Sequence, residues 1–156
     1  MIKLDKQILD TTSAKAKTAK RKRMNYNFHP VLEDPLQRML NAVEPGTYIR
    51  PHKHENPDKT EVFMILRGRI LVVEFDDQGN ITDFMVLDAA TENFAAEIPP
   101  RTWHTIISLE EGSIAYEIKN GPYNPIDDKN FATWAPPEGS PLCNDFIRKI
   151  IDSTTG

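Results

Sequence analysis

From residue 36 onward, short segments rich in apolar and β-branched residues alternate with clusters of turn-forming residues. These segments cover residues 36–43, 47–52, 61–75, 81–87, 94–98, 103–109 and 113–119. The clusters between them are rich in Gly, Pro, Asn and Asp, as in ENPD at 55–58. Short strands that are separated by turns about every 8–12 residues are typical of an antiparallel sandwich or barrel. No strand alternates with a long helix, so a parallel doubly wound sheet is not expected.

The remaining segments flank this strand-rich region. A weak apolar stripe followed by several alanines predicts a helix over residues 4–20. Residues 24–35 contain two Asn and two Pro, which predicts an ordered loop. Residues 121–141 are rich in proline and aromatic residues and are expected to pack over a sheet face or an edge. The sequence CNDFIRKII, residues 143–151, predicts a short closing helix.

These elements predict one all-β domain, and a length of 156 residues fits a single domain. We expect a small antiparallel, jelly-roll-like barrel over residues 36–120. An N-terminal helix and an ordered loop in residues 1–35 are expected to pack on this barrel. Residues 121–156 are expected to add a proline-rich extension and a short C-terminal helix.

Composition and charge exclude several classes of protein. A net charge of -4 argues against a general nucleic-acid binder, which usually has a basic surplus. Residues 15–23 carry six positive charges and no acid, and we interpret them as a solvated helix end. The single cysteine, Cys143, allows no internal disulfide, and no apolar run approaches the ~20 residues that cross a membrane. Because the N-terminus has no apolar signal segment, we expect a cytoplasmic protein without a membrane partner.

A group of histidines and one glutamate suggests a metal site. His52 and His54 lie one residue apart, and residues at i and i+2 of a strand point to the same face. Glu61 begins the next apolar segment, and His104 lies in a later one. Three imidazoles and one carboxylate suit a divalent transition metal such as Fe, Mn, Ni, Co or Zn. Such a set leaves up to two positions of an octahedral ion open for water or substrate.

The spacing of these residues resembles the two signatures of the cupin superfamily. The first signature is matched in order by Gly46, His52, His54, Glu61 and Gly68. In the second, PPRTWH supplies Pro99 and His104 at the family spacing. The resemblance implies a small cupin barrel whose metal ligands are the three histidines and the glutamate.

Two departures from the cupin pattern concern the turns of the site. The gap between His54 and the carboxylate is six residues, not three or four, if Glu61 is the ligand. Asp58 is the alternative, but it follows Asn-Pro in a turn, where Asp is expected for structural reasons. We prefer Glu61 because its spacing to Gly68 fits and it begins an alternating strand. Arg101 stands where the second signature has its internal glycine.

A closer resemblance extends over most of the chain, from about residue 1 to 141. The stretches NYNFHP, 37–70, IPPRTWHT and GPYNPIDDKNFATWAPPEGSP together look like the WbuC family of cupin-fold metalloproteins. This resemblance implies a cupin barrel with an added N-terminal helix and a bound metal. It also implies a link to the biosynthesis of O-antigen and other surface polysaccharides, and it specifies no reaction.

Strand alternation predicts which other side chains face the interior beside the ligands. Counting back from His52 turns Tyr48 and Arg50 inward, if residues 47–52 are extended. Counting on from His104 adds Ser108. An inward arginine beside a metal favours an anionic ligand, because guanidinium binds carboxylate and phosphate in a bidentate manner. The alternatives are that Arg50 forms an ion pair or lies at the barrel rim.

Three further residues are candidates for contact with a substrate or for its chemistry. Asn25 and His29 lie in a polar cluster that is able to fold over the mouth of the barrel. Their side chains are equally suited to hydrogen bonds with the backbone of their own loop. For acid–base chemistry the candidates are Tyr48 and Glu117, although the sequence does not determine which face of its strand Glu117 occupies.

Three functions are compatible with these residues. The first is a metal-dependent isomerase, epimerase or oxygenase acting on a small anionic or sugar-derived substrate. The second is a cupin that binds or senses a metal or small ligand without turnover. The third is a metal-independent epimerase or ketoisomerase that uses histidine as a base, which the complete His3Glu set disfavours. Because barrel edges in small cupins often pair, a homodimer is also expected.

Overall fold

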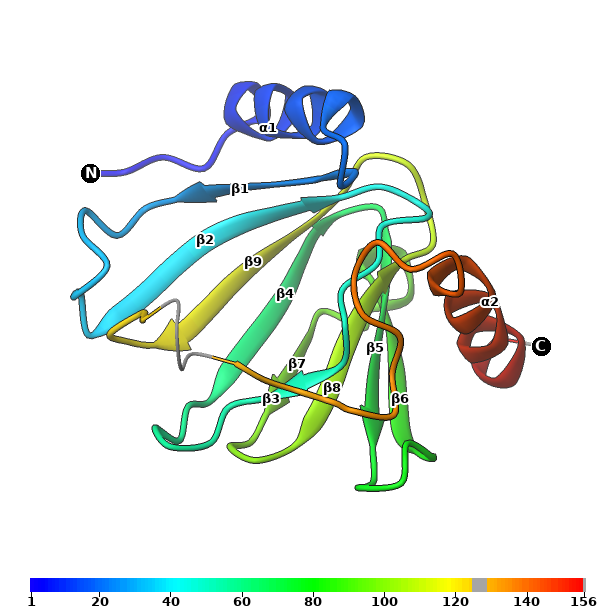
Figure 1. Ribbon diagram of the computed structural model, residues 1–156. Helices are drawn as coiled ribbons and strands as arrows, with labels where there is room; N and C mark the ends of the chain where they lie inside the picture. The colour runs from blue at the N-terminus through cyan, green and yellow to red at the C-terminus, as the bar shows by residue number, and fades with distance from the viewer. Residues whose placement is uncertain (125–128, 156) are drawn as a thin grey trace.

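The computed structural model describes residues 1–124 and 129–155. Within these residues, ten strands form two antiparallel five-stranded sheets, in the orders β1-β2-β9-β4-β7 and β10-β3-β8-β5-β6. The helices lie outside the sheets, α1 beside β1 and β2 and α2 on the opposite side (Figure 1). The elements are α1 (Lys6–Thr18), β1 (Arg23–Asn27), β2 (Leu36–Val43), β3 (His52–Lys53), β4 (Glu61–Arg67), β5 (Arg69–Phe75), β6 (Ile81–Asp88), the 3-10 turn Ala89–Thr91, β7 (Ala95–Ile98), β8 (Trp103–Ser108), β9 (Ser113–Asn120), β10 (Asn130–Phe131) and α2 (Cys143–Thr154).

Alternation along the strands divides the apolar residues among three layers. Between the sheets lies a cluster that includes Phe63, Val72 and Ile106. The next residues along the same strands point outward, so Ile107 of β8 belongs to the cluster under α2. Ile114 of β9 belongs to the cluster under α1. The fold is therefore a two-sheet barrel whose outer faces are each covered by a helix.

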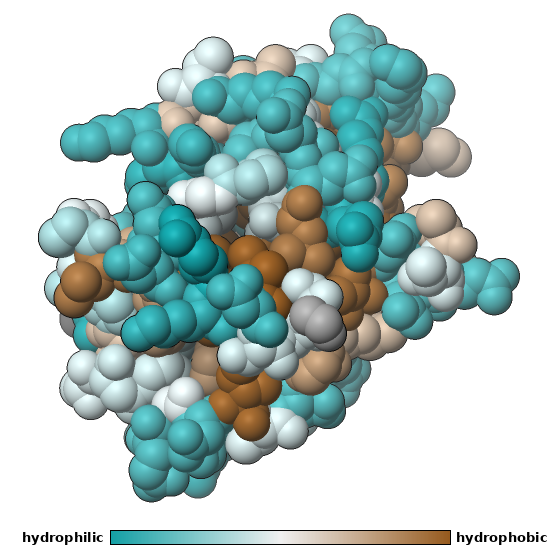
Figure 2. Space-filling view, turned by 90° about the vertical axis from the view of Figure 1, so that its right-hand side faces the viewer, coloured by the Kyte–Doolittle hydropathy of each residue, from teal (hydrophilic) through white to brown (hydrophobic). Residues whose placement is uncertain are grey.

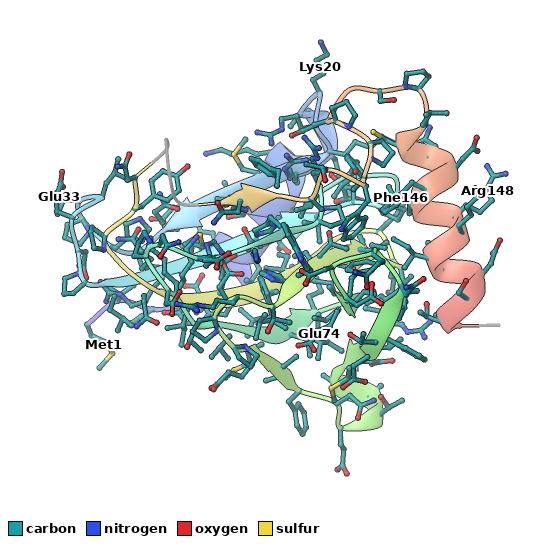
Figure 3. The ribbon with its side chains drawn as sticks, turned by 60° about the horizontal axis from the view of Figure 1, so that its bottom comes forward. Met1, Lys20, Glu33, Glu74, Phe146 and Arg148 are labelled. Carbon is teal, nitrogen blue, oxygen red and sulfur yellow. The ribbon has the colours of Figure 1, made fainter. Side chains whose placement is uncertain are left out.

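Each helix is held by its own local interactions. Asp5 caps α1, and its carboxylate accepts a hydrogen bond of 3.1 Å from the backbone N–H of Ile8. In α2, Phe146 faces the sheets and Arg148 faces away from them (Figure 3). The face of the molecule that carries α2 shows hydrophobic residues between hydrophilic ones (Figure 2). Neither helix in the described part of the chain is long and apolar enough to cross a membrane.

The predicted fold class is confirmed: a small antiparallel barrel with an N-terminal and a C-terminal helix. The predicted segments 36–43 and 113–119 correspond to β2 and β9 within one residue. The predicted loop 24–35 is wrong at its start, because Arg23–Asn27 pairs with β2 as an edge strand. The barrel also takes a strand from the extension, since Asn130–Phe131 pairs with β3.

The predicted strand 47–52 is wrong over most of its length. Only its last residue, His52, belongs to a strand, which it forms with Lys53. Residues 48–51 have no regular secondary structure. Because residues 48–51 do not pair with another strand, the direction of their side chains cannot be counted back from His52 by strand alternation. The predicted inward positions of two site residues, Tyr48 and Arg50, depended on this counting.

Candidate metal centre and its cavity

Four buried side chains from adjacent parts of both sheets converge inside the barrel. His52 of β3 is the register partner of His104 of β8, and His54 follows β3 directly. Glu61 is the first residue of β4, in the facing sheet. One ligand atom from each of the four residues lies within 4.8 Å of the others. The structure thus brings together the whole His3Glu set that the cupin-like spacing indicated.

The hydrogen bonds of two histidines direct their Nε2 atoms toward the cluster. Nδ1 of His52 lies 3.0 Å from the carbonyl oxygen of Arg50, and Nδ1 of His104 lies 2.9 Å from that of Thr102. A carbonyl only accepts, so each Nδ1 carries the proton and each Nε2 of a neutral ring keeps its lone pair. This is the arrangement that metal-binding histidines use.

The cluster is arranged as a cation site. Nε2 of His52 is buried and has no hydrogen-bond partner among the described residues. Nε2 of His104 lies 2.8 Å from Oε2 of Glu61, although both atoms are acceptors when the ring is neutral. A proton or a metal ion between them resolves this contact. The donor set, three imidazoles and one carboxylate, is the one that suits a divalent transition metal.

Electrostatics keep the ligands in the forms that a metal needs. Burial, with a contribution from Lys129, holds the pKa of His52 well below its ordinary value, so the ring is neutral near pH 7. Burial raises the pKa of Glu61, but the imidazoles of His104 and His54 beside its carboxylate outweigh burial and hold that pKa well below its usual range. Oε1 of Glu61 lies 2.9 Å from Nε2 of His54 and 3.4 Å from Nζ of Lys119.

The long turn before Glu61 has its own structural role. Asp58 points away from the cluster and binds Arg101, whose Nε lies 3.0 Å and 3.1 Å from the two carboxylate oxygens. Arg101 has a φ of 67°, which explains why the cupin pattern has a glycine there. Its backbone N–H donates to the carbonyl of His54 at 3.0 Å. The preference for Glu61 over Asp58 agrees with this geometry.

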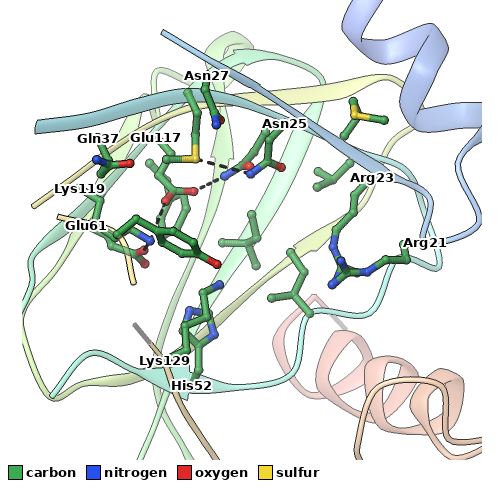
Figure 4. Close-up of a pocket in the computed structure, with 18 of the residues that line it drawn as sticks. Arg21, Arg23, Asn25, Asn27, Gln37, His52, Glu61, Glu117, Lys119 and Lys129 are labelled. Carbon is green, nitrogen blue, oxygen red and sulfur yellow. Dashed lines mark hydrogen bonds and ion pairs between the residues drawn. The ribbon is translucent and has the colours of Figure 1, made fainter. Parts of the chain in front are cut away.

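Three residues of the cluster, His52, Glu61 and His104, line one wall of a cavity of about 700 Å³ between the two sheets (Figure 4). This volume falls within the range of small-molecule sites. Glu117 and Lys119 of β9 face the cavity beside Glu61, with Lys119 Nζ 3.8 Å from the Glu117 carboxylate. The side-chain amide of Asn41 donates to Glu117. Burial, followed by the charge of Glu61, raises the pKa of Glu117.

Two candidates from the N-terminal polar cluster also border this cavity. Asn25 of β1 lines it, and its amide lies 3.5 Å from the sulfur of Met39. His29 lines it as well, while its Nδ1 accepts a hydrogen bond of 3.1 Å from the backbone N–H of Arg38. His29 therefore borders the cavity and fixes the local backbone, and its contact with a substrate stays a prediction.

Three other candidates lie elsewhere. Tyr48 packs edge-on against Phe146 of α2, and its hydroxyl donates to the carbonyl of Pro136 at 2.6 Å. Arg50 donates from Nε and Nη2 to the carbonyl of Ala132, at 3.1 Å and 2.7 Å. The hydroxyl of Ser108 donates to the carbonyl of Glu110 at 2.9 Å. None of these three residues lines the cavity, and for Tyr48 and Arg50 the reason is that the chain before His52 is not a strand.

Several cavity residues were missed by sequence reasoning. They include Arg21, Arg23, Gln37, Asn41 and Lys119. Once the register of β9 is known, Lys119 follows from Glu117 by alternation. The wall position of Arg23 depends on the pairing of β1 with β2, which the predicted loop did not include.

The family comparison concerns the first half of the chain and part of the barrel. Residues 4–87 match a family model described as "Domain of unknown function (DUF6016)". The chain belongs to this family. No protein of curated function matches it. The family description assigns no activity, so the function of this DUF6016 protein has to be inferred from the site.

Solved structures share the fold of this DUF6016 protein. The capsular polysaccharide assembling protein CapF from Staphylococcus aureus has a TM-score of 0.56 and 19% identity over 70% of this chain and 29% of its own. A single-residue variant of oxalate decarboxylase from Bacillus subtilis has a TM-score of 0.54 and 17% identity over 70% of this chain and 28% of its own. The chain thus spans less than a third of these proteins, and the similarity shows the fold alone.

Proposed function

We propose that this protein is a metal-dependent cupin enzyme that acts on a small anionic or sugar-derived substrate in the cytoplasm. One divalent transition metal ion would be held by His52, His54, Glu61 and His104. The observation that carries this proposal is the convergence of the four buried ligand atoms within 4.8 Å, beside a cavity that three of the four residues line. When bound, such an ion supplies Lewis-acid polarisation of a carbonyl or hydroxyl group.

The polar groups beside the cluster favour catalysis on a substrate rather than simple storage of a metal. Glu117 lies in the same cavity and is buried, and its raised pKa favours the protonated form relative to an exposed glutamate. We assign it the transfer of a proton to or from the substrate. Asn41, which donates to it, and Lys119 beside it would orient the carboxyl group. Tyr48 has no part in this proposal because it packs under α2.

A sugar-derived substrate is supported by the amide groups on the cavity wall. Asn25, Asn27, Gln37 and Asn41 offer both donors and acceptors, which suits a ligand with several hydroxyl groups. CapF, which shares the fold, is a capsular polysaccharide assembling protein. A role of this chain in surface polysaccharide (O-antigen) biosynthesis, and the WbuC relationship, are our proposals. A homodimer is proposed as well, and a solution scattering mass of one chain would contradict it.

Metal analysis of the purified protein tests the centre. The wild-type protein is expected to contain about one equivalent of a transition metal, and His52→Ala is expected to lose most of it, because an imidazole ligand is removed. His29→Ala is the matched control, since it removes the one histidine outside the cluster. If His52→Ala retains the same metal content as His29→Ala, the proposed centre is wrong.

A further inference from the structure

The cationic residues of the basic run 15–23 are exposed except for Arg23, as expected for a solvated helix end, and the last part of the run also borders the cavity beside the His3Glu cluster. Helix α1 ends at Thr18, and β1 begins at Arg23, so the chain passes from the helix into the barrel here. Arg21 and Arg23 both border the cavity. Figure 4 shows them on the side of the cavity opposite Glu61 and Lys119, with their guanidinium groups close together.

The charge of the cavity wall is opposite to that of the protein as a whole. The net charge of the chain is -4. Among the described residues, the wall carries five cationic side chains and two carboxylates. The cations are Lys20, Arg21, Arg23, Lys119 and Lys129, and the carboxylates are Glu61 and Glu117. Of these, Lys20 extends outward at the edge of the molecule (Figure 3). A cavity wall of this sign concentrates anionic ligands.

The two guanidinium groups form ion pairs with the same carboxylate of the protein. Nε and Nη2 of Arg21 lie 2.6 Å and 2.9 Å from the two oxygens of Glu138. Nη2 of Arg23 lies 2.8 Å from the same carboxylate, and its Nη1 donates to the carbonyl of Tyr48 at 2.8 Å. Two positive charges against one negative charge leave a net positive group. Glu138 is 42% exposed, so an incoming anion is able to compete with it.

We propose that Arg21 and Arg23 form a second anion subsite, which binds a phosphate group of the substrate in competition with Glu138. The inference rests on the proposed function, in which the other end of the same ligand meets the His3Glu cluster. It narrows the substrate class to a phosphorylated sugar derivative, either a sugar phosphate or a sugar nucleotide. Paired arginines suit phosphate because each guanidinium binds two of its oxygens, and phosphate carries more charge than a carboxylate.

Titration calorimetry on the protein as purified, with its metal content measured for every sample, tests this subsite. The probes are uridine diphosphate, glucose 1-phosphate and uncharged glucose. Arg21→Gln is expected to weaken the binding of the phosphorylated probes about tenfold, because a charge-assisted bidentate contact is lost. Arg69→Gln is the matched control, since Arg69 is a half-exposed arginine paired with Asp88, outside the cavity. This control is expected to bind like the wild type.

Glu138→Gln separates the anion subsite from a purely structural contact. If the arginines bind phosphate, removal of the competing carboxylate is expected to tighten binding about threefold or more, as expected for the loss of an exposed ion pair. If the ion pairs only hold β1 to the C-terminal segment, Glu138→Gln is expected to bind the phosphorylated probes no more tightly than the wild type. Tighter binding of uridine diphosphate indicates a sugar nucleotide, and tighter binding of glucose 1-phosphate indicates a sugar phosphate.

The two proposals fail in different ways. The subsite is wrong if no phosphorylated probe binds, if Arg21→Gln binds like Arg69→Gln, or if Glu138→Gln brings no gain. Each of these results applies only when the variants that are compared contain the same amount of metal. Absence of metal from the wild-type protein contradicts the metal centre instead, while the dependence of phosphate binding on Arg21 and Glu138 is still measured.

Discussion

At the scale of single residues, two acidic groups lie near the ligand position, and only one reaches the cluster. Glu61 is 2% exposed and contacts two of the histidines, whereas Asp58 pairs with Arg101 at the surface. The general cupin spacing favours Asp58 by its distance from His54. Burial and convergence favour Glu61, because its carboxylate lies inside the barrel against His54 and His104.

We therefore predict opposite results for two substitutions that each remove one negative charge. Glu61→Gln is expected to lower the bound metal to a small fraction of the wild-type amount, because a charged oxygen ligand is replaced by a neutral amide. Asp58→Asn is expected to keep the metal and to leave the stability nearly unchanged, as for an exposed ion pair. Metal content measured by mass spectrometry of both proteins checks this. Equal loss in both would show that the turn itself controls the site.

The residues of the His3Glu cluster were predictable and the positions of Tyr48 and Arg50 were not, for a physical reason. The histidines and Glu61 lie in or directly beside paired strands, where alternation and spacing determine the side-chain direction. Tyr48 and Arg50 lie in a segment without a ladder, so the same counting placed them in the cavity wrongly. Arg21 and Glu138 are 117 residues apart, and their contact depends on the whole fold.

At the scale of elements, the barrel depends on tight connections between its strands. Gly68 joins β4 to β5 with a φ of +71°. Just before it, between Ile65 and Arg67, the pairing of β4 with β9 shifts its register. That shift turns Arg67 out of the barrel toward α1, where it pairs with Asp10 at 2.9 Å. This explains why Arg67 is absent from the cavity although simple alternation from Glu61 points it inward.

The connection at Gly68 predicts a steric effect that can be separated from backbone strain. A Cβ at this position would overlap the hydroxyl of Ser113 and lie 2.8 Å from its Cα. Gly68→Ala is therefore expected to lower the free energy of unfolding by about 2–4 kcal/mol, from the left-handed φ and the overlap together. In Gly139→Ala the φ is +88° and no atom lies within 4 Å of the new Cβ, so only about 1–2 kcal/mol is expected. Urea unfolding of both variants measures the difference, and equal losses would contradict the steric contribution.

The two short edge elements show where prediction from sequence failed at this scale. In β1, Asn25 and Asn27 line the cavity and so are polar on the face that would ordinarily be apolar. The polar and apolar residues of RMNYNF, residues 23–28, do alternate as in a strand, but the two Asn and the two Pro of residues 24–35 favoured a loop. Strand β10 has two residues and is specified by its pairing with β3, a contact that no local pattern records. The long central strands, with apolar residues on both faces, were predictable because both sides are covered.

At the scale of the whole molecule, the His3Glu cluster lies between the two sheets and takes residues from both. His52 and His104 belong to one sheet and Glu61 to the other, so an ion bound by all four residues would link both layers of the barrel. An ion that binds the folded state and not the unfolded chain adds to the free energy of unfolding by mass action. The cavity beside the cluster is not filled by side chains, so this link is expected to contribute measurably to stability.

We predict that removal of the metal lowers the melting temperature of the protein. An ion present at 100 times its dissociation constant adds about 2.7 kcal/mol, and about 2–4 °C per kcal/mol applies to a domain of this size. Dialysis against a chelator is therefore expected to lower the melting temperature by roughly 5–10 °C, with recovery when a transition metal is restored. His52→Ala should melt at the same temperature with and without chelator, whereas His29→Ala should respond like the wild type. A wild-type melting temperature that is indifferent to both chelator and added metal would show that the two sheets are held together without an ion.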